Sequence, residues 1–344
     1  MLRALLGTEL PIIQAPMAGV QGSALAIAVS NAGGLGSLPC AMLTPDLLRQ
    51  ELTAIRAQTT RPFNVNFFCH QPPAPDAARE LAWRATLGAY YAEYGIDAAQ
   101  IAAGPGRAPF SAELAEVLAE FAPPVVSFHF GLPAPELLAR VRAWGAVVLS
   151  SATTVQEGLW LQAQGVDAVI AQGLEAGGHR GMFLSDDLNT QLGTLALVPQ
   201  LVAALRVPVI AAGGIADAAG VAAAMALGAA GVQVGTSYLM CTEASTSALH
   251  RAALKSEAAA TTALTNLFTG RPARGIVNRV MRELGCLHPG APQFPLATAA
   301  IVPLRAQAEQ RGLTDFTPLW SGQNASSCRA MSAAELTQAL AAGL

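Results

Sequence analysis

The sequence is poor in charge and in aromatic side chains. Only 12% of its 344 residues are charged and 6% are aromatic, whereas 52% are hydrophobic and the mean hydropathy is +0.40. This composition excludes an intrinsically disordered chain, because apolar burial can offset the entropy cost of ordering. The net charge of −3 offers nucleic acid no basic surface, and the few aromatics offer little for stacking bases.

Long apolar runs are also missing. The richest stretch, residues 198–227, is interrupted by charged or helix-breaking residues, which include Arg206, Pro208, Gly213, Gly214 and Asp217. A membrane-spanning helix needs roughly 20 uninterrupted apolar residues. The first residues, MLRALLGTELPII, lack the cleavage pattern of a signal peptide. We therefore expect no membrane partner and a cytoplasmic location.

The cysteines and histidines lack metal-ligand spacing. The five cysteines include no CxxC pair, and the five histidines include no HxxxH or HxxEH pair. A disulfide framework is improbable at this size, and free or buried thiols are the better interpretation. We expect no bound metal.

Eight short β-rich runs alternate with Ala/Leu-rich amphipathic stretches, and several of these runs are almost wholly apolar, as buried parallel strands are. They are residues 12–15, 34–38, 63–68, 125–130, 146–150, 168–172, 209–212 and 231–235. Thr-Pro or Asp signals open several of the intervening helical patterns, and Gly145, Gly165 and Gly228 follow their ends. Eight βα units predict an α/β fold of the (β/α)8 TIM-barrel type. An open doubly wound sheet is the alternative.

Two segments break this rhythm. Residues 69–124 are too long for one connection and contain a proline-rich piece followed by two helical patterns, and residues 241–318 follow the eighth strand. We predict a barrel over residues 1–240, a smaller, mainly helical cap over 241–318 inserted after the eighth strand, and a segment over 319–344 that returns to the barrel.

Polar residues and glycines gather where the predicted strands end, which is the face that carries active sites in such barrels. Gly213 and Gly214 follow the seventh strand, and Gly235 and Thr236 follow the eighth. Glycine turns ahead of helices let backbone N–H groups approach an anion, which predicts a phosphate cradle. The alternative is that Gly213 and Gly214 only permit a tight turn.

His179 lies in the glycine-rich stretch EAGGHRG after the sixth strand. The functional interpretation is a general acid/base beside a ring-shaped cofactor, and the alternative is a solvated loop histidine. His129 lies within an apolar strand, where a satisfied core histidine is expected.

Several segments together resemble the nitronate monooxygenase family, formerly called 2-nitropropane dioxygenases, and its class I bacterial members in particular. They are PIIQAPMAG (11–19), SFHFGLP (127–133), QGLEAGGHRG (172–181), PVIAAGGIAD (208–217), GVQVGTSYL (231–239), FTGRPARGI (268–276) and PLWSGQ (318–323). The resemblance implies a barrel with non-covalent FMN. It also implies oxidation of alkyl nitronates, such as propionate-3-nitronate, by O2 to a carbonyl compound and nitrite.

The resemblance also implies roles for particular residues. His179 matches the family's active-site histidine, which deprotonates neutral nitroalkanes where that activity exists. The expected cofactor-binding residues are Ala15, Pro16, Met17, Asn66, Gln172, Gly177, Gly178, Gly213, Gly214, Gln233, Val234, Gly235 and Thr236. Independently of the resemblance, the sequence offers candidates for contact with a small anionic substrate, with Arg180 as the cation nearest to His179. They are His129, Arg180, Tyr238, Trp320 and Gln323.

Related chemistries share this barrel. NAD(P)H:quinone reductases and flavin-dependent enoyl-acyl carrier protein reductases have the FMN and a similar EAGGHxG segment, so they are the alternative function. A phosphate-binding barrel without flavin is a further alternative, which the colour of the purified protein would exclude. We expect a monomer or a homodimer.

Overall fold

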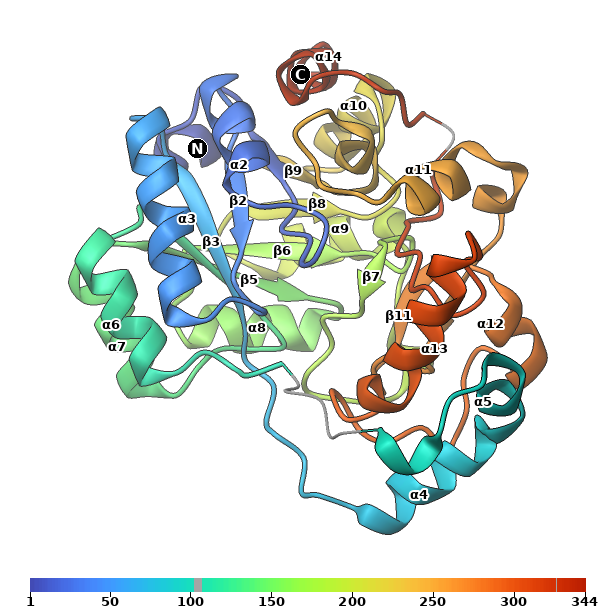
Figure 1. Cartoon of the computed structure of the whole chain (residues 1–344). Helices are drawn as coiled ribbons and strands as arrows, with labels where there is room; N and C mark the ends of the chain where they lie inside the picture. Colours follow the sequence, from blue (N-terminus) through green and yellow to red (C-terminus); the bar gives the residue numbers. More distant parts are fainter. Residues whose placement is uncertain (102–106, 326) are drawn as a thin grey trace.

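Eight parallel strands form a barrel in the computed structural model, which describes residues 1–101, 107–325 and 327–344. The strands are β1 (Ile12–Gln14), β2 (Gly36–Pro39), β3 (Phe63–Phe68), β4 (Val125–His129), β5 (Val147–Ala152), β6 (Ala168–Gln172), β8 (Val209–Ala212) and β9 (Gly231–Val234). Their order is β1-β9-β8-β6-β5-β4-β3-β2, and a parallel bridge between Ile13 and Leu35 joins the two ends. The eight predicted strands and the barrel are therefore confirmed, and the open sheet is excluded (Figure 1).

Helices surround this barrel. They are α2 (Ser23–Asn31), α3 (Pro45–Gln58), α6 (Ala112–Phe121), α7 (Pro135–Ala143), α8 (Val155–Ala163), α9 (Thr194–Ala204), α10 (Ala218–Ala226) and α14 (Ala333–Ala341). Helix α1 (Leu2–Leu6) packs instead with inward-facing side chains of the barrel, such as Ile13 and Val125. The predicted start signals act as caps: the Thr44 side chain accepts from the Leu47 amide, and Asp217 accepts from the Gly220 amide. The chain turns away after several helices through glycines with positive φ, such as Gly165 at 78°.

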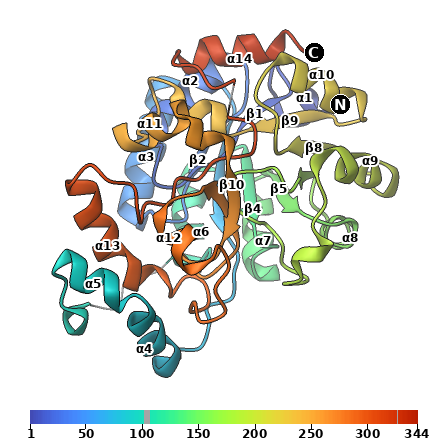
Figure 2. The ribbon, with the colours of Figure 1, turned by 90° about the vertical axis from the view of Figure 1, so that its right-hand side faces the viewer.

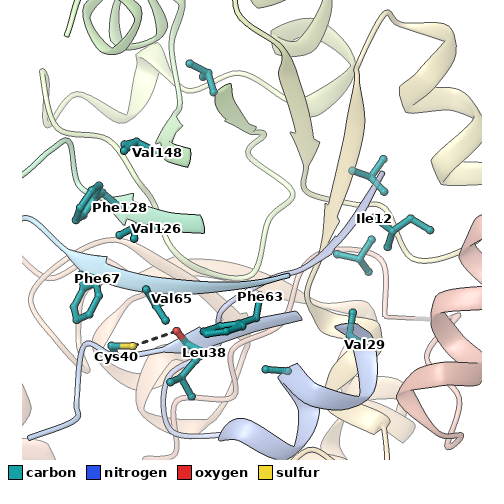
Figure 3. Close-up of a cluster of buried hydrophobic side chains, with 14 of the residues drawn as sticks. Ile12, Val29, Leu38, Cys40, Phe63, Val65, Phe67, Val126, Phe128 and Val148 are labelled. Atoms are coloured by element: carbon teal, nitrogen blue, oxygen red, sulfur yellow. Dashed lines mark hydrogen bonds between the residues drawn. The ribbon is translucent and has the colours of Figure 1, made fainter. Parts of the chain in front are cut away.

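Side chains alternate between the two faces of each strand, and this alternation positions the site. Phe63, Val65 and Phe67 of β3 point outward into the core beneath the helices, in one cluster with residues of β4 and β5, and Figure 3 shows Phe67 next to Phe128 of β4. Residues of the opposite parity therefore point into the barrel. Asn66 of β3 and His129 of β4 belong to this inward set, near the carboxyl ends of their strands.

A second hydrophobic cluster forms the smaller domain and draws on two distant parts of the chain. Helices α4 (Ala77–Thr86) and α5 (Gly88–Tyr94) pack with α12 (Arg279–Leu284) and α13 (Thr298–Gln310), as Figures 1 and 2 both show. Trp83 and Tyr91 are buried there, and Tyr91 Oη donates to Ala300 O at 2.6 Å. The proline-rich segment after β3 thus leads into the smaller domain, whereas the prediction from the sequence builds that domain only from residues after the eighth strand.

The smaller domain also contains strands, which the expectation of a mainly helical cap did not include. The strands β10 (Thr262–Thr265) and β11 (Ala273–Ile276) are antiparallel, and β11 also pairs with β7 (Gly178–His179). In this register Ala273 lies opposite His179. The region also holds α11 (Ala248–Lys255) and η4 (Glu257–Ala260). Elsewhere in the described residues, 3-10 turns form η1 (Ala98–Gln100), η2 (Leu188–Thr190) and η3 (Thr236–Met240).

The described part of the chain lacks two features. None of its helices is long and apolar enough to cross a membrane, and no three His, Cys, Asp or Glu side chains within it are grouped so that they could hold a metal ion.

Candidate active site

An open cavity of about 1350 Å³, including the space at its mouth, lies over the carboxyl ends of the barrel strands. This is the face on which such barrels carry their active sites. Its lining includes fifteen residues predicted from the sequence: Ala15, Pro16, Met17, Asn66, His129, Gln172, Gly177, Gly178, His179, Gly213, Gly214, Gln233, Gly235, Thr236 and Trp320. Among the described lining residues, the ionisable side chains are Arg107, His129, His179 and His250, and none is acidic. The cavity therefore suits an anionic ligand.

The glycine turn after β8 approaches its neighbours too closely for a side chain. Gly213 and Gly214 have φ of 118° and 73°, and a Cβ on Gly213 would lie 2.9 Å from Thr194 Oγ1. The Glu175 carboxylate fixes Thr194, the residue that lies against Gly213, because it accepts from Thr194 N and Thr194 Oγ1, both at 2.8 Å. The glycines thus satisfy both interpretations made from the sequence, since they permit a tight turn and also line the cavity.

Three inward amide side chains end at the cavity. Asn66 Nδ2 donates to Ser127 Oγ at 2.9 Å. Gln172 fixes the next loop, because its Nε2 donates to His179 O at 2.9 Å and its Oε1 accepts from Gly181 N at 2.7 Å. Gln233 differs from both: its Oε1 is buried and has no hydrogen-bond partner among the described residues. A buried acceptor without a partner indicates a ligand donor at this position.

His179 lies on β7 and forms part of the cavity wall. Its Nε2 lies 2.9 Å from Thr269 Oγ1, and its ring centroid lies 5.3 Å from that of Phe294 and 5.5 Å from that of Trp320. Its Nδ1 has no partner within the described parts of the chain. Burial holds the pKa of His179 well below its ordinary value, and the nearby Arg107 lowers it further. The ring is therefore neutral at pH 7.

His129 contacts the backbone of the segment that carries His179. Its Nδ1 lies 3.0 Å from Ser151 Oγ, and its Nε2 lies 3.3 Å from His179 O. Burial lowers the pKa of His129 to about 3. Both ring nitrogens have partners, as expected of a satisfied core histidine, while one edge of the ring still reaches the cavity lining.

Four predicted site residues lie outside the cavity lining. Arg180 is fully buried, and its guanidinium donates to protein oxygens within its own loop. Tyr238 is buried in the core, where its hydroxyl pairs with Thr337 Oγ1 at 2.8 Å. Val234 points outward because its neighbour Gln233 points inward. Gln323 is exposed, and only its backbone amide binds the loop, at Glu175 O. The predicted ligand contacts of these side chains are thus not supported.

Several residues that shape the cavity were missed. Arg107, Ser151, His250 and Asn324 line it, and Thr269 holds the His179 ring. Thr269 lies in the segment FTGRPARGI, whose resemblance to the family was the available signal. Arg107 follows no strand end and lies in no such segment, so the sequence offered no signal for it.

This chain is similar to known proteins over nearly its whole length. The model of the family described as nitronate monooxygenase matches residues 1–343. A nitronate monooxygenase from Paraburkholderia phytofirmans is 44% identical over 98% of this chain and 93% of its own length. One from Pseudomonas aeruginosa is also 44% identical, over 98% of this chain and 96% of its own.

Two solved structures are also similar to this chain over nearly its whole length. A nitroalkane oxidase from Streptomyces ansochromogenes superposes with a TM-score of 0.90 at 40% identity and covers 100% of this chain and 97% of its own. FabK from Thermotoga maritima superposes with a TM-score of 0.71 at 26% identity, over 98% of this chain and 94% of its own. The resemblance drawn from the sequence segments is therefore confirmed, and this chain is an oxidoreductase that belongs to the nitronate monooxygenase family.

Proposed function

We propose that this enzyme oxidises alkyl nitronates, such as propionate-3-nitronate, with O2 to a carbonyl compound and nitrite, using FMN in the cavity and His179 as acid/base. The observation that carries the proposal is a neutral histidine in the wall of a cavity that has no acidic side chain among its described lining residues. The relatives named nitronate monooxygenase at 44% identity support the reaction class. A cytoplasmic location and a monomeric or homodimeric state stay predictions from the sequence.

The residues of the cavity fit FMN. Gln233 Oε1 has no hydrogen-bond partner among the described residues, and the flavin ring system has a donor for it. The glycine turns after β8 and β9 line the cavity, and backbone N–H groups of such turns ahead of helices can bind an anion. We assign the phosphate to Gly213, Gly214, Gly235 and Thr236. We assign the ring to the β1 segment Ala15, Pro16 and Met17, with Asn66, Gln172 and Gln233 near its polar edge. When bound, FMN supplies the electron transfer and the reaction with O2 that side chains cannot perform.

His179 moves the proton when the substrate is a neutral nitroalkane. The Thr269 hydroxyl lies 3.4 Å from Arg271 O, so it can donate there while it accepts from His179 Nε2. In that arrangement Nε2 carries the ring proton and Nδ1 keeps a lone pair that can accept the α-proton. A nitronate has already lost this proton, so its oxidation depends much less on His179.

Anaerobic titration of the purified yellow protein tests this function. Propionate-3-nitronate should bleach or shift the visible flavin absorbance promptly, while NAD(P)H should leave it unchanged. The likeness to FabK makes a reductase the second candidate. Rapid bleaching by NAD(P)H, with no response to the nitronate, would assign the enzyme to that class. A colourless protein that takes up no FMN would contradict the cofactor assignment.

A further inference from the structure

One guanidinium at the cavity wall has no anionic partner. Arg107 is half-buried and lines the cavity, yet its guanidinium makes no hydrogen bond or ion pair with any described residue. The Arg107 Cζ atom lies 5.9 Å from the centroid of the Phe294 ring. Other buried arginines here are satisfied; Arg274 Nε, for example, donates to Leu174 O at 2.9 Å. An uncompensated buried cation is costly, which indicates a site for an anion.

This anion is not the cofactor phosphate, because the barrel separates the two positions. Phe110 N donates to Phe68 O at 2.8 Å, which anchors the Arg107 segment to the end of β3. The proposed phosphate cradle follows β8 and β9. In the strand order, β3 and β8 are four positions apart in a ring of eight, so they lie on opposite sides of the barrel. Arg107 therefore lies on the side of the barrel opposite the proposed phosphate cradle.

Arg107 and His179 both contact the same aromatic ring, that of Phe294. The ring of Phe294 is 5.3 Å from the His179 ring, centroid to centroid, and is also the ring that Arg107 contacts. Arg107 is also the charged group with the largest effect on the pKa of His179. A short substrate whose reacting carbon lies at His179 can therefore place its far end at Arg107.

We propose that Arg107 binds a carboxylate carried by the substrate, and so selects nitronates with a second negative charge over plain alkyl nitronates. This inference rests on the proposed function. A planar guanidinium can bind a carboxylate through two parallel hydrogen bonds, which gives both affinity and orientation. Arg107 is thus a specificity-determining residue, whereas the chemistry at the other end of the substrate depends on the cofactor and His179.

Steady-state kinetics of Arg107→Met with two matched substrates test the proposal. Propionate-3-nitronate carries the carboxylate, and propyl-1-nitronate has the same three carbons without it. Loss of a charge-assisted hydrogen bond predicts an increase in KM of about 10- to 100-fold for propionate-3-nitronate. The KM for propyl-1-nitronate should stay near the wild-type value. Arg107→Lys keeps the charge and should retain part of the preference, and the exposed Arg206→Met is the control.

Three outcomes would overturn the proposal. They are an equal loss for both substrates, an unchanged KM for both, and a loss of bound FMN from Arg107→Met, which would make Arg107 a cofactor residue. Calorimetric titration with succinate, an unreactive dianion of similar length, gives a test without turnover. If the wild-type enzyme oxidises neither nitronate, the proposed function fails. The Arg107 site then still stands if Arg107→Met weakens succinate binding, and falls if succinate binds both proteins equally or neither.

Discussion

Arg180→Met tests whether the buried cation beside His179 serves the fold or the substrate. The sequence made Arg180 a candidate for contact with an anionic substrate. The structure buries it completely and directs its guanidinium to Gln172 O and Gly173 O, both at 2.7 Å, and to Gln191 Oε1 at 3.0 Å. We therefore expect the substitution to destabilise the protein, with no selective effect on substrate affinity.

The size of this effect follows from the three hydrogen bonds. Each bond from a charged donor contributes about 1.5–3 kcal/mol, and the cost of burying the guanidinium offsets part of the sum. Gly173 O also keeps a second donor, Ala176 N at 3.1 Å. We therefore expect Arg180→Met to lower the free energy of unfolding by about 2–4 kcal/mol. With an unfolding entropy of about 2.1 cal/mol/K per residue, a chain of 344 residues should lose roughly 3–6 °C in Tm.

Thermal unfolding followed by circular dichroism measures this loss, with nitronate kinetics recorded on the same preparations. Arg206→Met changes an exposed arginine in the same way and should leave Tm unchanged. The reasoning would be refuted if Arg180→Met kept the wild-type Tm and raised the KM for nitronates about tenfold, because Arg180 would then bind the substrate.

Three further predictions concern His179 and Tyr238. His179→Asn should lower kcat/KM for a neutral nitroalkane by about 10²- to 10⁴-fold and spare nitronates, since only the former must lose a proton; equal losses with FMN still bound would exclude the base. Because the pKa of His179 is held well below 6.5, its ring stays neutral as the pH falls through 6.5. The kcat/KM for the nitroalkane should therefore stay level through pH 6.5 and fall only well below it. A pH profile of kcat/KM that falls with a midpoint near 6.5 would contradict the depressed pKa. Tyr238→Phe removes one buried hydrogen bond, so the free energy of unfolding should fall by about 1 kcal/mol in a denaturation experiment. A changed KM would instead indicate that Tyr238 contacts the substrate.

The barrel and most of the cavity could be predicted because their signals are local. Each strand is a short apolar run, and its alternation decides which residues point inward. Once the strands are placed, the carboxyl-end rule brings Asn66, Gln172, Gly213 and Gln233 to one face. Val234 shows the limit of the motif: it lies inside a recognised segment, yet its parity turns its side chain into the core.

What escaped prediction depends on contacts between distant segments. The strand β7 has two residues, one of them glycine, and exists because β11 pairs with it. Nothing in the sequence of helices α4 and α5 indicates that they pack on α13, which lies more than 200 residues later in the chain. The charge of Arg180 is visible in the sequence, but the carbonyl groups that surround it are not.

The pairing of β7 with β11 sets where this enzyme can be divided. The strand that carries His179 belongs to a three-stranded sheet whose other two strands, β10 and β11, are part of the smaller domain. Arg180 N continues this contact by donating to Pro272 O at 2.9 Å. A chimaera that joins the barrel of one relative to the cap of another would therefore separate the histidine from its supporting strand. The exchangeable module has to include residues 172–181 with the cap, although that loop lies within the barrel sequence.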